Sequence, residues 1–245
     1  MIEILQWSTL AVCSVVAVAR IPSALRGQNR SLFYIFVLAT VAIMLSIPQP
    51  YTAIDSRLGS ENYTNLILRF VIYATIFLTG RAIAKAFDDT SSMRRLTGPL
   101  GMGVLGVIMV ATVVLFLLAD TTGTSTGLND LPGRSGQNAV LINLYAAAGR
   151  LYPAYVAACL LPATLKAVGQ TWPAAVRFGA ALLSMAFVAL ILGSFFPLIP
   201  EPLLFLQPLI NYTAVLALIL GLTSIWVGKI AVRHAKPTLK SYAKK

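Results

Sequence analysis

The side chain with the strongest bearing on chemistry is Arg150, which lies near the middle of the apolar run 137–161. If this run crosses a membrane, a guanidinium at its centre costs about 2.5–3.5 kcal/mol on insertion scales. Apart from Glu3, at the start of the first apolar run, none of the eight Asp and Glu residues lies inside an apolar run, so no salt bridge deep within the membrane is available to offset that cost. Backbone carbonyls, tyrosine hydroxyls, trapped water or an anionic ligand are left as partners for Arg150.

Polar and small residues share one helical face with this arginine. Four residues follow each other on that face at helical spacings: Asn143, Ala147, Arg150 and Ala154. Pro153 removes a backbone donor and so frees a carbonyl in the preceding turn. A polar and locally broken helix at the bilayer midplane is typical of transporter sites. The pattern therefore favours a binding role for Arg150, with Asn143 beside it.

A second arginine, Arg69, lies about one turn inside the outer end of another apolar run. Tyr73 follows four residues later and therefore faces the same side of a helix. Asn211 and Tyr212 lie near the outer end of the last apolar run. Arginines without acidic partners favour a carboxylate or phosphate ligand. One hypothesis is that these side chains and Arg150 line a cavity that opens to the outside.

Both arginines also have structural interpretations. Arg150 could pair with a polar group of the protein alone. The segment 137–166 would measure about 45 Å as a helix, which exceeds a bilayer core, so it could slide until Arg150 reaches the headgroup layer. Arg69 could extend outward to the headgroups in the same way.

The composition defines the elements that must position these residues. Only 11% of the 245 residues are charged and 58% are hydrophobic, whereas a soluble domain carries about 25% charged residues. This excludes a soluble enzyme, a disordered protein and a disulfide-stapled secreted module. A spanning helix needs about 20 mostly apolar residues. Seven runs fit, which predicts an all-α, polytopic membrane protein with seven transmembrane helices: 2–19, 31–51, 65–86, 99–119, 137–161, 174–196 and 208–230.

The distribution of charge predicts the orientation of these helices. With the N-terminus outside, 15 of the 19 Lys and Arg residues, Arg20 and Arg30 among them, fall in the inner segments, and only Arg57 and Arg134 fall outside. Inner loops of membrane proteins are rich in Lys and Arg, so we predict an outside N-terminus and an inside C-terminus. The outer loop 121–136 is rich in Gly, Ser, Thr and Asn and is predicted to be flexible. Among the glycosylation patterns, only the one at Asn62 faces outside.

Other chemistries lack the residues that they need. Cys13 and Cys159 lie in apolar runs and the single histidine is His234, so we predict neither a metal site nor a cofactor. The string GMGVLG at 101–106 matches a dinucleotide-binding pattern, but it lies in an apolar run where glycines serve helix packing. A retinal protein would need a lysine in the middle of its last span, whereas Lys229 lies at the inner end. No nucleophile–base pair is visible, so we predict that the chain is not an enzyme.

A basic tail, 233–245, is predicted to follow a seven-helix transmembrane domain, 1–232. Its five Lys and Arg residues either fix the orientation of the chain or attract anionic headgroups, at about 1 kcal/mol per basic residue. Membrane lipids, and a membrane protein that pairs with Arg150 or the tail, are therefore the expected partners. A nucleic acid is not expected, because no aromatic residues are interleaved with the basic ones.

Four segments of the first 90 residues carry a resemblance to a known family: RIPSALR at 20–26, SIPQPY at 46–51, DSRLG at 55–59 and NLILR at 65–69. They resemble a family of actinobacterial seven-helix membrane proteins that are described only as candidate transporters. The resemblance implies a multi-pass protein of a bacterial plasma (inner) membrane, and it supplies no ligand residues.

The leading hypothesis from the sequence is a non-enzymatic membrane protein that recognises a small anionic or lipid-headgroup ligand, as a transporter or receptor. The alternative is a non-catalytic structural subunit of a larger membrane complex.

Overall fold

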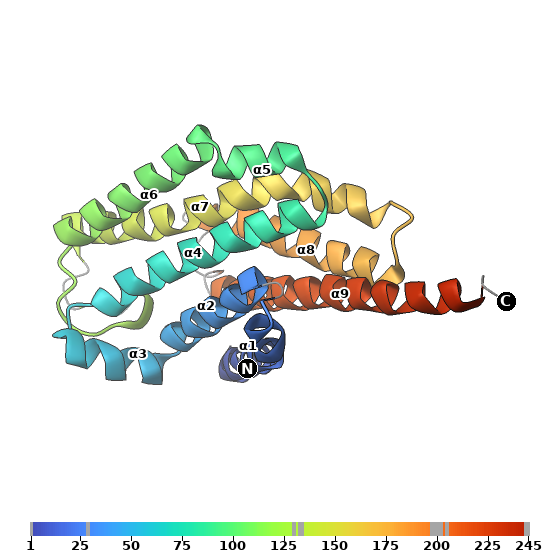
Figure 1. The fold of residues 1–245 in the computed structure, drawn as a ribbon. Helices are drawn as coiled ribbons and strands as arrows, with labels where there is room; N and C mark the ends of the chain where they lie inside the picture. Colours follow the sequence, from blue (N-terminus) through green and yellow to red (C-terminus); the bar gives the residue numbers. More distant parts are fainter. Residues whose placement is uncertain are drawn as a thin grey trace.

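The computed structural model describes residues 2–27, 30–128, 131, 135–196, 203 and 206–242, with residues 229–242 described as backbone alone. Arg134, one of the two basic residues predicted outside, lies beyond these residues. The helices follow in chain order (Figure 1): α1 Ile2–Leu25, α2 Arg30–Ser46, α3 Pro48–Asp55, η1 Ser56–Leu58, α4 Tyr63–Ala86, α5 Thr90–Thr97, α6 Pro99–Leu118, η2 Thr126–Leu128, α7 Gly136–Val168, α8 Ala174–Gly193 and α9 Leu206–Tyr242.

Six of these helices are each long and apolar enough to cross a membrane: α1, α4, α6, α7, α8 and the first part of α9. The pair α2 and α3 passes the same test when taken together, which gives up to seven spans. Large apolar side chains cover the outer face of α6, where Val107 is 71% exposed and Leu117 is 68% exposed. A surface of this kind suits hydrocarbon rather than water, so the chain has the character of a multi-pass membrane protein.

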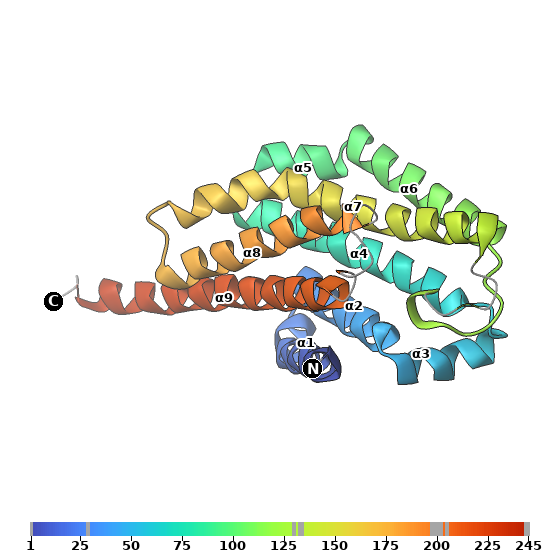
Figure 2. The same cartoon turned by 180° about the vertical axis from the view of Figure 1, so that it is seen from behind.

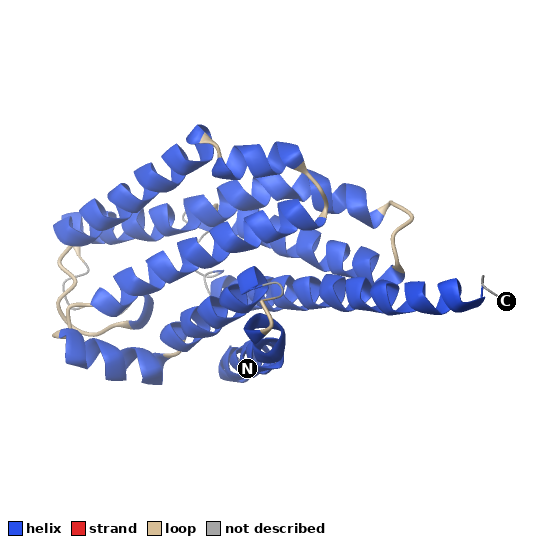
Figure 3. Cartoon of the chain, in the orientation of Figure 1, coloured by secondary structure: helices blue, strands red, loops and turns tan. Residues whose placement is uncertain are grey.

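The described residues contain helices and loops but no strand (Figure 3), which confirms the all-α prediction for this part of the chain. Six helices form a closed ring of contacts, in the order α1, α2, α4, α7, α8, α9 and back to α1. Helices α5 and α6 pack outside this ring against α4 and α7 (Figures 1 and 2). Whereas α4, α6 and α7 run along the molecule, α1 is seen almost end-on and lies steeply across them.

Successive connections lie at opposite ends of the molecule. The end of α4, the α7–α8 connection and the C-terminal part of α9 lie at one end, on the right in Figure 1. The segment α3, the end of α6 and the start of α7 lie at the other end. The basic residues Arg81, Lys85 and Lys166 belong to the first of these ends, as the predicted charge sidedness requires.

The predicted run 31–51 does not form one straight helix, because the chain bends by 85° between α2 and α3. The bend falls at Ile47, whose extended backbone (φ −88°, ψ 132°) interrupts the helix. The following residue, Pro48, disfavours a helical conformation at the residue before it and is itself well placed to start a new helix. As a result, α3 extends away from the α2 axis toward the loops at this end of the molecule (Figure 1).

Three helices are longer than the apolar runs that predicted them. Helix α1 continues beyond 19 to Leu25 and so includes Arg20, which the sequence placed in a loop. Helix α7 extends to Val168 and continues through Pro153 and Pro162, so the expected break at Pro153 does not occur. Helix α9 continues through the predicted boundary at 232 as far as Tyr242, and residues 243–245 of the tail lie outside the described residues.

Candidate functional site

Helices α4 and α7 bring the predicted arginines together. Asn65, Arg69 and Tyr73 follow one another at four-residue intervals on α4 and therefore share one face. That face packs against α7. Arg69 lies close enough to Arg150 for the two positive charges to repel each other.

The guanidinium of Arg69 packs against the backbone of α7 at Gly149. A Cβ atom at this position would overlap the guanidinium, so only glycine leaves room for it. The carbon at the centre of the guanidinium also lies 5.2 Å from the ring centre of Tyr145, in cation–π range. The side chain is thus held between a small residue and an aromatic ring.

Pro153 contributes to this site without breaking α7. A proline has no N–H group, so the carbonyl of the residue four positions earlier, Gly149, has no helical donor. The residue that makes room for Arg69 is therefore also the one whose carbonyl is free to accept a hydrogen bond. The local dipole of that carbonyl favours a positive charge nearby.

Two buried donors on α4 and α7 have no acceptor. The Nε atom of Arg69 and the hydroxyl of Tyr152 are both buried without a hydrogen-bond partner. Tyr73 is only 2% exposed, and its hydroxyl lies 2.8 Å from the hydroxyl of Thr112 on α6. The rings of Tyr73 and Tyr152 meet edge to face, with centroids 5.8 Å apart. Buried donors without partners are costly, so this region has unmet capacity for an acceptor.

The other predicted site residues lie elsewhere. Asn143 is exposed on α7, two turns before Arg150, and Asn211 is exposed on α9. Tyr212 is 9% exposed and joins a different junction, because its hydroxyl bonds to Gln6 of α1 at 3.1 Å and to Ser46 of α2 at 2.9 Å. The structure therefore groups Arg69, Tyr73 and Arg150, and it gives Tyr212 a role in holding α1, α2 and α9 together.

A polar network covers the end of the molecule next to this site, and the sequence did not reveal it. Asp55 and Asn62 are both fully buried. The carboxylate of Asp55 accepts hydrogen bonds from the backbone N–H groups of Asn62 and Thr64, both at 3.2 Å, and from the hydroxyl of Thr124 at 2.9 Å. We call the residues 51–65 and 119–128 the outer cap.

Asn62 is the centre of the outer cap. Its amide nitrogen donates to the carbonyls of Thr121 at 2.7 Å and Gly123 at 2.6 Å. Its amide oxygen accepts from the hydroxyl of Tyr51 at 2.6 Å and from the N–H of Ser125 at 3.0 Å. These bonds hold Thr121, Gly123 and Ser125 of the loop that the sequence predicts to be flexible, while 129–130 and 132–134 lie outside the described residues. With its amide buried and bonded on both sides, Asn62 is no glycosylation acceptor in this fold.

The outer cap connects to Arg69 through neutral side chains. The hydroxyl of Tyr51 also lies within hydrogen-bonding reach of Asn65. The hydroxyl of Tyr145 donates to Asn65 at 2.9 Å, and the ring of Tyr145 faces Arg69. A continuous polar path therefore runs from the carboxylate of Asp55 to the arginine pair. The clustering of Asp, Ser, Gly and Asn between 55 and 62 was the one available signal, since these residues favour hydrogen-bonded turns.

Arg20 is a further buried charge that the sequence placed in an inner loop. It is 1% exposed, and the central carbon of its guanidinium lies 4.3 Å from the ring centre of Trp226 on α9. Both of its Nη atoms are buried without a hydrogen-bond partner. The contact joins α1 to α9, and a cation–π contact of a desolvated arginine is worth about 2 kcal/mol.

The two best-formed hollows among the described residues do not include the arginine pair. One lies between α1 and α2, and the other lies beside Asp120 and Asn138. The expected open cavity at Arg69 and Arg150 is not one of them, because Arg69 packs directly on α7. Among the described residues no group of three His, Cys, Asp or Glu side chains could hold a metal ion.

Comparisons with protein-family models, with curated proteins and with solved structures found no match to this chain. The function is therefore inferred from the residues of this chain and their arrangement.

Proposed function

We propose that the protein binds a small anion, through a carboxylate or phosphate group, at Arg69 and Arg150, and that it acts as a membrane transporter or receptor without catalysis. The observation that carries this proposal is that the guanidinium of Arg69 packs at Gly149, the residue before Arg150, on helices that contain no acid. Helices α4, α6, α7, α8 and α9 have no Asp or Glu at all. Two like charges repel strongly where water is scarce, and an anion between them would remove that repulsion.

The surrounding donors suit the same ligand. Arginine donates through a planar fork that matches the two oxygens of a carboxylate or phosphate. The unpartnered Nε of Arg69 adds a further donor. An oxyanion can accept from the guanidinium groups, whereas a cation would meet only repulsion.

The outer cap supports access from the outside. A polar path leads from the loops to Arg69, and the side chains that connect Asp55 to Arg69 along it are neutral. In the orientation that we propose, with the N-terminus outside, the outer cap lies between the exterior and the site, and an anion would enter past it. The resemblance of the first 90 residues supports a bacterial plasma membrane as the location.

The test is anion-dependent thermal stability of the purified protein in detergent. Phosphate or acetate should raise the melting temperature above that in chloride at equal ionic strength, by about 2–4 °C for each kcal/mol of binding energy. Arg69→Gln and Arg150→Gln should abolish the difference. Arg57→Gln is the matched control, because Arg57 is an exposed arginine outside the spans, and it should respond like the wild type.

Two outcomes would reject this proposal. The first is an equal response in the wild type and in both arginine variants. The second is a wild type without any response to phosphate or acetate, together with an Arg150→Leu variant that is simply more stable. The second outcome would mean that Arg150 is an unpaired charge with no ligand.

A second candidate function, a structural subunit of a larger complex, is favoured by the surface beside Arg150. Val140, Leu144 and Leu151 of α7 are each at least 50% exposed, and Arg150 lies partly buried at the edge of this strip. A partner helix with an acidic residue would cover the strip and neutralise Arg150. The mass of the native protein after mild detergent extraction tests this second function. A lone monomer counts against a role as a subunit, and a defined larger assembly supports it.

A further inference from the structure

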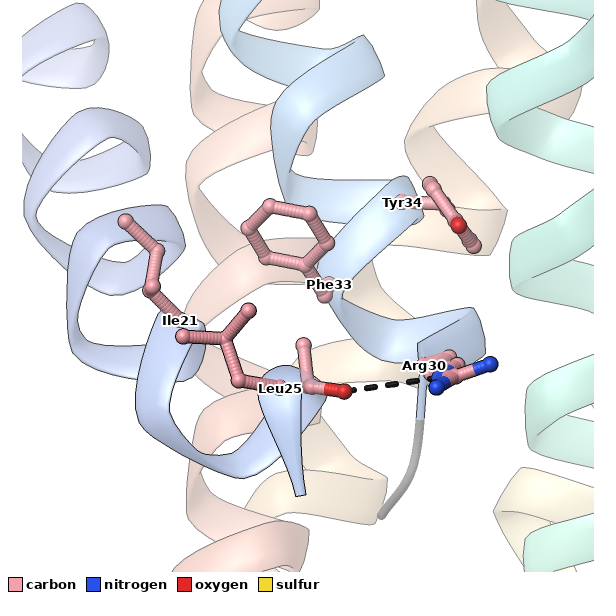
Figure 4. Close-up of a pocket in the computed structure, with 6 residues that line it drawn as sticks. Ile21, Leu25, Arg30, Phe33 and Tyr34 are labelled. Carbon is pink, nitrogen blue, oxygen red and sulfur yellow. Dashed lines mark hydrogen bonds between the residues drawn. The ribbon is translucent and has the colours of Figure 1, made fainter. Parts of the chain in front are cut away.

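A hollow of about 260 Å³ lies where α1 ends and α2 begins, away from the arginine pair. Figure 4 shows its walls, and six residues line it: Ile21, Ala24, Leu25, Arg30, Phe33 and Tyr34. The hollow is smaller than the about 300–1,000 Å³ of an enclosed ligand site. It therefore suits a segment of a chain-like molecule better than a complete compact ligand.

The walls of the hollow are apolar and open to the side. Leu25 is 80% exposed, Tyr34 is 54% exposed and Ile21 is 41% exposed. Side chains of this kind at the boundary of a spanning helix face lipid chains, and a tyrosine at that level is typical of the membrane–water interface. A hydrocarbon chain can thus enter from the bilayer without crossing the protein.

One end of the hollow carries a positive charge. The Nε atom of Arg30 donates to the carbonyl of Ala24 at 3.4 Å, which ties the guanidinium to the end of α1 (Figure 4). This bond uses one of the five donors of the guanidinium and leaves its Nη groups for another acceptor. Arg26 is exposed and lies two residues after Ala24 in the chain, and none of the six lining residues is acidic.

We propose that this hollow binds one anionic phospholipid, with the headgroup phosphate on Arg30 and an acyl chain between Ile21 and Phe33. The phosphate oxygens match the guanidinium fork, and Arg26 adds a second positive charge beside it. The apolar walls exclude a soluble anion as the natural occupant, because such an anion would leave them unused. This site is separate from the site at Arg69 and Arg150, so either proposal can fail without the other.

The experiment measures lipid retention by native mass spectrometry after reconstitution into vesicles of phosphatidylcholine with phosphatidylglycerol. The wild type should retain phosphatidylglycerol in preference to phosphatidylcholine. Arg30→Gln should weaken this preference by about fivefold, which is the effect of one basic residue near an anionic surface. Arg57→Gln, which removes an exposed arginine from another loop, should retain the wild-type preference.

A second variant separates a shaped site from general electrostatic attraction. Ala24→Phe fills the hollow but keeps every charge, and it should weaken the preference for phosphatidylglycerol at least as much as Arg30→Gln does. Glycerol phosphate supplies the same headgroup without a chain, and it should not compete with the lipid. The proposal is overturned if Ala24→Phe retains phosphatidylglycerol like the wild type, if glycerol phosphate displaces the lipid, or if Arg57→Gln weakens retention as much as Arg30→Gln.

Discussion

Arg69 occupies space that exists only because residue 149 is glycine. Its guanidinium lies where a Cβ atom of residue 149 would be. The carbonyl of Gly149 has no helical donor, because Pro153 lacks a backbone N–H group. The position of the Arg69 guanidinium therefore depends on two uncharged residues of α7, Gly149 and Pro153. A charged side chain can therefore be positioned by residues that have no polar side-chain group.

Gly149→Ala should displace the guanidinium of Arg69 and abolish the anion response of the melting temperature. The overlap should also destabilise the fold by about 1–3 kcal/mol, as overpacking does. The measurement is thermal unfolding in detergent, with and without phosphate.

The matched control for that variant is Gly106→Ala on α6. A Cβ atom at Gly106 would meet nothing within 4 Å, so this variant should keep both stability and the anion response. Equal behaviour of the two alanine variants would contradict the role given to Gly149.

Asn62 shows how one side chain can organise a loop. Its backbone is left-handed (φ 58°), a conformation that asparagine tolerates better than most residues. Its amide joins Tyr51 to Thr121, Gly123 and Ser125 of the outer cap.

Asn62→Gly should destabilise the protein by about 2–4 kcal/mol, because several buried polar groups lose their partners. Glycine accepts the left-handed backbone without strain, so the loss of stability reports the hydrogen bonds of the Asn62 side chain. Chemical unfolding in detergent measures the free energy of unfolding of each variant. Ser60→Gly, at another left-handed residue (φ 59°), should be neutral, and an equal loss in both variants would refute this account.

Among the elements, the short helix α5 depends on its N-terminal cap. The carboxylate of Asp89 accepts hydrogen bonds from the backbone N–H groups of Ser91 at 3.1 Å and Ser92 at 3.2 Å. Ser92 also donates to the carbonyl of Cys159 at 2.7 Å, which fastens α5 to α7. Burial by itself would raise the pKa of Asp89, but the hydrogen bonds from Ser92 and Ser91 outweigh it and lower the pKa below its usual value.

Asp89→Ala should cost about 1 kcal/mol at neutral pH, as the loss of a capping side chain does. Because the folded pKa of Asp89 is lowered, its contribution is complete above the unfolded pKa of about 3.9 and is lost as the pH falls through the folded pKa. The stability difference between wild type and variant should therefore shrink below about pH 4. Thermal unfolding across this pH range measures it, and a constant difference would contradict the charged cap.

At the scale of the whole molecule, the alternation of connections between two ends is the basis of the proposed orientation. Ser56 is exposed in η1, beside α3, and Thr171 is exposed in the α7–α8 connection at the opposite end. The charge distribution predicts that the end with Thr171 faces the inside.

Single-cysteine variants test this orientation in intact cells. In a Cys13→Ser, Cys159→Ser background, a membrane-impermeant maleimide should label Ser56→Cys directly, and it should label Thr171→Cys only after permeabilisation. Both native cysteines are buried, so the background should label weakly. The reverse pattern would invert the topology, and labelling of both positions in intact cells would contradict a spanning bundle.

Local hydropathy and charge counts along the chain were sufficient to predict the all-helical class, the membrane character and the approximate positions of the helices. The sequence also identified Arg69, Tyr73 and Arg150, since a charged or polar group in an apolar run stands out without any coordinates. The bend at Ile47 was readable in principle from Pro48, although hydropathy alone concealed it.

Which of these residues lie together depends on the packing of the helices. Arg69 packs at Gly149, the residue before Arg150, because glycine leaves room for its guanidinium, and Tyr212 binds Gln6 and Ser46 instead, because α9 packs beside α1. Asp55 and Arg20 looked like ordinary loop charges, yet both are buried by segments far away in the sequence. The physical reason is that burial and hydrogen-bond partners are properties of packing between distant segments, whereas hydropathy is a property of each segment alone.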